Sequence, residues 1–251
     1  MRTATTPRPL SRLALLGLLL SLLAGSALLL AGVSNRWQWL DFRSALTLFR
    51  WAAYGGIIAV LLSLLGVIMA RPGSARRGFP LAVLGLVVGL IVVGIPWRWQ
   101  HKAQRLPFIH DITTDLENPP AFVAILPLRA GAPNSAEYGG PEVAAQQRAG
   151  YPRLGPLNLQ IPPQQAFAHA LAAAREMGWE IVASEPPEGR IEATATTFWF
   201  GFKDDVVVRV TPVHGGSRID VRSMSRVGRS DVGANAERIT AYLARIARKS
   251  E

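Results

Sequence analysis

A run of 21 residues without a charged side chain lies near the start of the sequence, from Leu13 to Val33. A helix rises about 1.5 Å per residue, so about 20 apolar residues are enough to cross the hydrocarbon core of a bilayer. The run therefore predicts a membrane-spanning helix. A chain that contains such a segment is constrained to a fold built around a membrane anchor.

A cleaved signal peptide is the alternative interpretation of this run. Arg2, Arg8 and Arg12 precede it, and the small residues of Ala24–Ala27 would suit a cleavage site. The apolar run is longer than the core of an ordinary signal peptide. We therefore favour an uncleaved anchor.

Two further apolar segments, Trp51–Ala70 and Phe79–Trp97, are joined by the short basic turn Arg71–Arg77 and predict an antiparallel helical hairpin. No ionisable side chain interrupts any of the three segments, which argues against an ion or proton path. Five tryptophans lie at segment ends, where indole rings favour the headgroup level: Trp37, Trp39, Trp51, Trp97 and Trp99. We predict an N-terminal tail at 1–12 and a membrane domain at 13–100, with helices at 13–33, 51–70 and 79–97.

The basic residues flanking the three segments divide six against six, so the positive-inside rule does not decide the orientation. The first helix usually dominates, and the turn Arg71–Arg77 is the most concentrated basic patch. We therefore expect a cytoplasmic tail in the bacterial inner membrane. Three crossings then place the rest of the chain on the periplasmic side.

The net charge of +10 belongs to the membrane part of the chain. Residues 1–105 carry twelve Lys and Arg against the single acid Asp41, whereas the remainder has 15 basic and 16 acidic residues. A nucleic-acid-binding domain needs its cations on the folded surface that meets the phosphates. We therefore predict the lipid bilayer, and no nucleic acid, as a partner. The absence of cysteine excludes disulfides and a thiol nucleophile.

Residues 101–162 contain many prolines and glycines and little periodicity, which predicts an irregular lead-in segment. Within it, Ala121–Leu126 is expected to add an edge strand to the sheet that follows. Apolar residues at helical spacing then predict a helix over 164–177. Four runs rich in β-branched and aromatic residues predict strands at 179–184, 190–200, 206–211 and 218–225. A final amphipathic helix begins at Ser230 or Asp231 and reaches Arg248. The expected fold is a three-helix transmembrane anchor plus a soluble α+β domain at 163–251. Its antiparallel sheet has about four strands, with two helices packed on one face.

The densest polar segment runs from Arg222 to Asn235. Residues 218–249 hold eight Lys and Arg against three acids, and arginines beside the free N–H groups of a helix start suit a carboxylate or phosphate. In the alternative, structural interpretation, Arg222 and Arg226 pair with Asp204 and Asp205. The candidate binding residues are Arg222, Ser223, Ser225, Arg226, Gly228, Arg229, Ser230, Asp231, Asn235, Asp204 and Asp205.

Familiar catalytic and cofactor patterns do not occur in the sequence. It has no phosphate-cradling glycine loop, no G-x-S-x-G elbow, no dinucleotide fingerprint and no histidine pair with metal spacing. A cluster of His110, Asp111 and Asp115 is a candidate cation site without a further ligand in view. We predict no metal site, no cofactor and no catalytic residue.

Several segments resemble the bacterial and plastid family known as domain of unknown function 1499. They are Thr197–Asp205 (TFWFGFKDD), Arg222–Asp231, Gly233–Asn235, the upstream His110–Pro120, and Tyr138 with the two glycines after it. The resemblance covers about residues 108 to 245 and implies a membrane-tethered arrangement, but it brings no established activity or substrate. Arg153 stands after Tyr-Pro where members often have an acid, which weakens a functional role for that position.

We therefore expect a membrane protein whose soluble domain is a noncatalytic module of the cell envelope. Its ligand would be an anionic molecule or an envelope protein. Two alternatives stay open: an enzyme of unrecognised type that uses the polar Arg/Ser/Asp cluster, and an accessory subunit of a membrane complex.

Overall fold

A computed structural model describes residues 8–250 of the chain. Residues 1–7 of the predicted tail and Glu251 at the end of the predicted soluble domain lie outside the described residues. The chain forms two compact units. The first comprises Met1–His101 together with Trp199–Gly201, and the second comprises Lys102–Phe198 and Phe202–Glu251.

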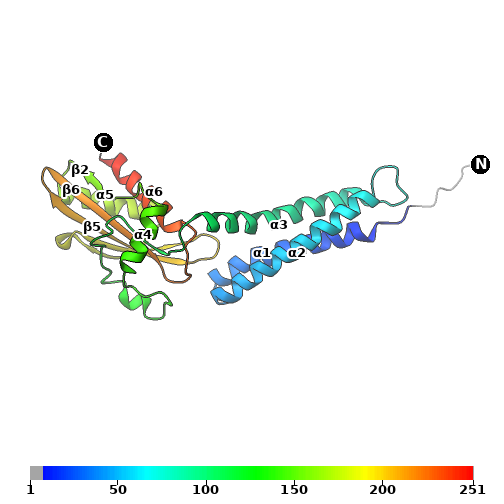
Figure 1. Ribbon diagram of the computed structural model, residues 1–251, viewed down its shortest axis with the longest axis horizontal. Coiled ribbons are helices and arrows are strands. Elements are labelled where there is room, and N and C mark those ends of the chain that lie inside the picture. The colour runs from blue at the N-terminus through cyan, green and yellow to red at the C-terminus, as the bar shows by residue number, and fades with distance from the viewer. Residues whose placement is uncertain (1–7, 251) are drawn as a thin grey trace, which may run out of the picture. The chain divides into compact units, whose positions relative to one another are not determined.

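Three long helices form the first unit: α1 (Arg12–Arg36), α2 (Phe42–Met69) and α3 (Phe79–Arg105) (Figure 1). All three are long and apolar enough to cross a membrane, as the sequence predicted. Each helix extends beyond its predicted apolar segment. The largest extension is at the start of α2, where the Asp41 side chain accepts hydrogen bonds from the N–H groups of Arg43 and Ser44 and so caps the helix.

Small residues allow close contact between the three helices. A Cβ atom added at Gly85 of α3 would lie 2.9 Å from the Leu18 backbone of α1, and one at Gly66 of α2 would lie 2.9 Å from the backbone of Ala14. The Ser21 hydroxyl of α1 donates a 2.6 Å hydrogen bond to the carbonyl oxygen of Gly85. Packing and interhelical hydrogen bonds of this kind replace the hydrophobic effect as the cohesive force in lipid.

The second unit is built on a six-stranded antiparallel sheet of order β1-β6-β5-β4-β3, with β2 also paired to β6. The strands are β1 (Asp111–Thr113), β2 (Leu157–Leu159), β3 (Glu180–Glu185), β4 (Arg190–Thr196), β5 (Lys203–Val213) and β6 (Gly216–Ser225). The antiparallel α+β prediction is confirmed, but the sheet has six strands and not four. The two unpredicted strands have three residues each, too few to show an alternating pattern.

Two details of the predicted strands are wrong. Ala121–Leu126 forms no strand, because the chain turns there into a short 3-10 helix, η1 (Leu126–Arg129). β4 ends at Thr196 and not at Phe200, because the Thr197 N–H donates to the carbonyl of Phe202 and closes a loop between β4 and β5.

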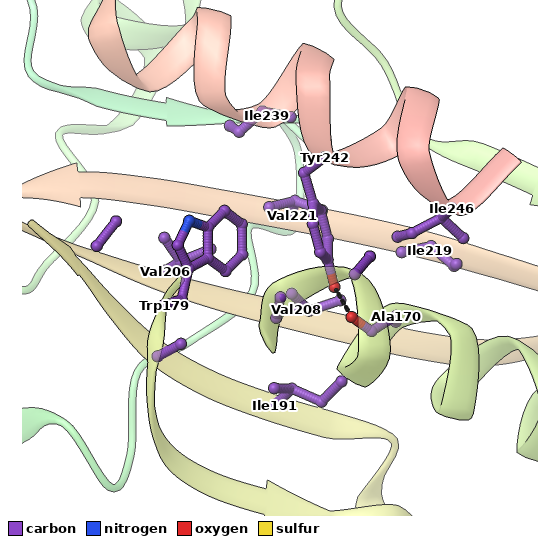
Figure 2. Packing of buried hydrophobic residues seen from close by; sticks show 14 of the residues in the cluster. Ala170, Trp179, Ile191, Val206, Val208, Ile219, Val221, Ile239, Tyr242 and Ile246 are labelled. Atoms are coloured by element: carbon purple, nitrogen blue, oxygen red, sulfur yellow. Dashed lines mark hydrogen bonds between the residues drawn. The ribbon is translucent and has the colours of Figure 1, made fainter. Parts of the chain in front are cut away.

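The main core lies between the sheet and two helices, α5 (Pro163–Glu176) and α6 (Ala234–Lys249), which cover one face as predicted. Figure 2 shows the Trp179 and Tyr242 rings between the sheet and these helices, with ring centroids 4.7 Å apart. The Tyr242 hydroxyl donates a 2.8 Å hydrogen bond to the carbonyl oxygen of Ala170. This bond ties the two helices together within the core.

The opposite face of the sheet carries a smaller buried cluster of Phe122, Ile125, Val207 and Met224. The segment that covers it is held by Glu192 of β4, a fully buried residue. Its carboxylate accepts hydrogen bonds from the backbone N–H groups of Val123, Ala124 and Ile125. A remaining helix, α4 (Gly140–Gly150), attaches to β1 because the Gln147 amide exchanges two hydrogen bonds with the Thr113 backbone. The 3-10 turn η2 (Pro186–Glu188) links β3 to β4.

Candidate functional site

The predicted binding residues come together at one end of the sheet. Asp204 and Asp205 lie at the start of β5 and pair in register with Ser225 and Met224 at the end of β6. Successive residues of a strand point to opposite faces, so the two aspartates serve different clusters. The connection between β6 and α6 contributes the remaining residues.

Asp205 lies on the face opposite α5 and α6, and its side chain is completely buried. The Arg226 guanidinium binds it through two nitrogen atoms at 2.8 and 2.9 Å. Arg129 donates a further 2.6 Å bond, and the Thr194 hydroxyl donates one of 2.9 Å. The predicted pairing of Arg226 with Asp205 is present in the structure. This network is a complete set of charge-assisted bonds around one carboxylate.

Arg222 has a different partner from the one that the structural interpretation gave it. Its guanidinium forms a two-nitrogen pair with Asp111 of β1, at 2.8 and 3.0 Å, and not with Asp204 or Asp205. The guanidinium also lies over the Phe122 ring, 4.9 Å from its centroid. Asp111 is 111 positions away in the chain, so local sequence did not indicate this pair.

A second cluster lies on the helix-covered face. The Ser223 hydroxyl donates to the Asn235 amide oxygen at 2.7 Å, and the Asn235 amide nitrogen donates to Ser225 and to the carbonyl oxygen of His110. Arg238 of α6 reaches Asp204 at 2.5 Å and also donates to Ser223. The cluster joins β6, β5 and the first turn of α6. Sequence reasoning missed Arg238, although it lies one helical turn after Asn235.

Asp231 occupies the start of α6. Its carboxylate accepts bonds from the N–H groups of Gly233 and Asn235, at 2.9 and 2.8 Å. The residue at the N-cap position is Gly233 and not Ser230 or Asp231, because the chain enters the helix through a left-handed conformation with φ +83°. Burial raises the pKa of Asp231 above its usual value, although the two backbone bonds act against that shift. The positive end of the helix is thus already matched by a carboxylate of the chain itself.

Arg229 differs from the other predicted arginines because it is exposed to solvent. Its guanidinium lies 5.3 Å from the ring centroid of Phe108, a residue that is itself 60% exposed. Within residues 8–250, no carboxylate forms a salt bridge with Arg229. Gly228 precedes it with φ +90°, and Ser230 follows it with its hydroxyl accepting from the Val232 N–H.

Two tyrosine hydroxyls near these clusters were not predicted. The Tyr138 and Tyr151 hydroxyls are buried and have no hydrogen-bond partner in the part of the chain that the structure describes. Burial raises the pKa of both hydroxyls to about 12, and the nearby carboxylates Asp111 and Asp231 act in the same direction.

No group of three metal-ligating side chains occurs among residues 8–250. The carboxylates of the candidate cation cluster form salt bridges with arginines: Asp111 pairs with Arg222, and Asp115 pairs with Arg209 and Arg218. A serine–histidine contact is present between Ser250 and His169, at 3.2 Å. The Ser250 hydroxyl donates to the carbonyl oxygen of Ile246, so its hydrogen is directed into the helix end and away from the imidazole.

Residues 111–246 match the model of a family described as protein of unknown function (DUF1499). The match covers all six strands of the sheet and begins after the three apolar helices. No curated protein matches the chain significantly.

Proposed function

We propose that this chain, which belongs to the DUF1499 family and carries three helices able to span a membrane, is a membrane-anchored, noncatalytic binding module. Its ligand presents an anionic group, either as a small molecule or on the surface of an envelope protein. The binding surface is the exposed part of the connection between β6 and α6.

The observation that supports this proposal is the division of the arginines in this connection. Arg222 and Arg226 are held by buried carboxylates. Arg229 is exposed, faces no carboxylate within the described chain, and lies over an exposed aromatic ring. A guanidinium backed by a ring retains its N–H donors for a carboxylate or phosphate.

The predicted residues then divide into two roles. Gly228, Arg229 and Ser230 form the contact surface, together with Phe108. Eight residues fix the position of that surface through their internal bonds and do not contact the ligand: Arg222, Ser223, Ser225, Arg226, Asp231, Asn235, Asp204 and Asp205. A rigid support reduces the entropy lost when the exposed arginine binds.

We further propose that the chain lies in the bacterial inner membrane with its second unit in the periplasm. An odd number of crossings separates the N-terminal tail from the second unit. The first helix and the basic turn Arg71–Arg77 favour a cytoplasmic N-terminus.

Site-specific photocrosslinking in cells tests the binding surface. A benzophenone amino acid replaces Phe108 in the full-length chain, and the control places it at Val213, an exposed apolar position at the far end of β5. We expect adducts from position 108 and not from position 213. A charge-assisted hydrogen bond contributes about 1.5–3 kcal/mol, so Arg229→Gln should reduce the adducts about tenfold or more.

A protein adduct would identify a partner, and an adduct of small mass would identify a ligand. Equal crosslinking from positions 108 and 213 would contradict the proposed surface. Crosslinking that Arg229→Gln leaves unchanged would contradict the role given to that arginine.

A further inference from the structure

The loop between β4 and β5 has an unusual composition for a strand connection. Its sequence from Phe198 to Phe202 is FWFGF, four aromatic residues in five. The loop is closed by two bonds across its base: the Thr197 N–H donates to the Phe202 carbonyl, and the Phe202 N–H donates to the Thr197 hydroxyl at 2.8 Å. Gly201 provides the left-handed conformation, with φ +67°, that the turn requires. The aromatic side chains are therefore presented from a defined turn.

Phe198 is 91% exposed, the highest value among the exposed large hydrophobic residues of the described chain. Exposure of most of an aromatic ring to water is unfavourable, since burial of such a side chain contributes favourable free energy. In a chain with membrane-spanning helices, such a ring can instead lie in the bilayer interface, where aromatic residues are enriched.

The next residues of the loop belong to the helical unit. The indole N–H of Trp199 donates a 3.3 Å hydrogen bond to the carbonyl oxygen of Leu29 in α1. Its ring lies so close to Gly32 that a Cβ atom there would be 2.2 Å away. The Asn35 amide nitrogen of α1 donates a 2.6 Å bond to the carbonyl oxygen of Phe200.

These contacts fix the level of Trp199 and Phe200 along the helices. Within this unit, the rings of Trp199 and Phe200 lie 5.2–5.8 Å from each other and from Phe49 of α2 and Trp99 of α3. The residues involved belong to the last turns of α1 and α3 and the first turns of α2, so they share one end of the unit. The exposed indoles that mark a membrane–water interface lie in these turns or in the adjoining connection between α1 and α2: Trp37, Trp39, Trp51, Trp97 and Trp99.

We propose that the loop Phe198–Phe202 is a membrane-interface anchor and that the Phe198 side chain inserts into the headgroup region of the bilayer that the three helices cross. Trp199 packs at the helix end that carries the exposed indoles, with Phe200 buried beside it, and Phe198 is the residue immediately before Trp199 in the chain. The occupant of this surface is lipid and not a second protein, because Phe198 directly adjoins Trp199, which packs at the helix end where the exposed indoles gather. This anchor is independent of the binding surface at Arg229.

Accessibility of a spin label in a reconstituted bilayer tests the anchor. The chain has no cysteine, so Phe198→Cys and Val213→Cys each provide a single labelling site in the full-length protein. Both positions are exposed; Phe198 lies in the loop that precedes β5, and Val213 is the last residue of that strand. In phosphatidylcholine nanodiscs we expect the label at 198 to collide more often with oxygen, which concentrates in lipid, than with a water-soluble nickel chelate. The label at 213 should show the opposite preference.

Two outcomes would overturn the anchor. Equal preference for the nickel chelate at both positions would place Phe198 in water. Low accessibility of position 198 to both reagents would show that protein, and not lipid, covers it. Thermal unfolding of both labelled variants within the error of the parent chain verifies that the substitutions leave the fold intact.

Discussion

Replacing Asp205 with alanine tests whether the polar cluster at the end of the sheet stabilises the fold. The carboxylate accepts bonds from Arg226, Arg129 and Thr194, and its side chain is completely buried. Removal of one partner from a buried ion pair costs about 3–5 kcal/mol, because the remaining charge stays buried without compensation. Two arginines lose their partner here, so we expect Asp205→Ala to reach the upper part of that range.

A loss of about 3–5 kcal/mol corresponds to a fall in Tm of about 6–20 °C, at about 2–4 °C per kcal/mol for a domain of this size. The assay is thermal unfolding of the full-length chain in detergent, followed by near-ultraviolet circular dichroism of the second unit. Arg229→Ala is the matched control, since Arg229 is exposed and forms no salt bridge within residues 8–250. It should change the unfolding free energy by less than about 0.5 kcal/mol. Equal effects of the two substitutions would refute the assignment of Asp205 to a structural network.

Three further predictions use pairs of related residues or a pH series. Tyr242→Phe leaves the buried Ala170 carbonyl oxygen without its 2.8 Å hydrogen bond and should destabilise the chain by about 1–2 kcal/mol in chemical unfolding. Tyr138→Phe removes a hydroxyl that has no partner in the described chain and should cost less than about 0.5 kcal/mol. In α3, Gly85→Ala should weaken helix packing by about 1–3 kcal/mol in a detergent unfolding titration, because the new Cβ atom meets the Leu18 backbone. At Gly94 a new Cβ atom has no neighbour within 4 Å, so Gly94→Ala should be neutral. Because the pKa of Asp231 is raised in the folded state, the folded chain binds a proton at this carboxyl more tightly than the unfolded chain does. The contribution of Asp231 to the free energy of unfolding should therefore fall as pH rises from 3.8 through the folded pKa. The stability of the parent chain relative to Asp231→Asn should therefore decline across that window, and parallel pH profiles of the two chains would contradict this assignment.

The helices and long strands could be predicted because their patterns are local. An uninterrupted apolar run needs no tertiary information, and β5 and β6 are long enough for β-branched residues to be recognised. β1 and β2 have three residues each, and both form by antiparallel pairing with the same edge of β6. Their presence depends on tertiary pairing, so no local pattern indicated them.

The candidate site was only partly predictable for a similar reason. The Arg/Ser/Asp segment was recognised by its density, and the pair of Arg226 with Asp205 by its proximity. The partner of Arg222 comes from β1, which the sequence did not show to be a strand. Arg129, the second cation at Asp205, lies in the turn η1 that follows a segment expected to form an edge strand. Because the structure of residues 101–162 was predicted incorrectly, the partners of Arg222 and Asp205 that come from this segment were missed.

In the proposed topology three helices cross the membrane, and the second unit lies on the side of the membrane opposite the turn between α2 and α3. Ala244→Cys in α6 and Ala75→Cys in that turn are exposed single-cysteine sites on the two sides of α3. Each variant is treated with a membrane-impermeant thiol reagent in cells whose outer membrane alone is permeabilised. We expect labelling at position 244 and none at position 75 until the inner membrane is opened. The reverse pattern would contradict the proposed orientation, and labelling of both positions from one side would contradict the spanning of α3.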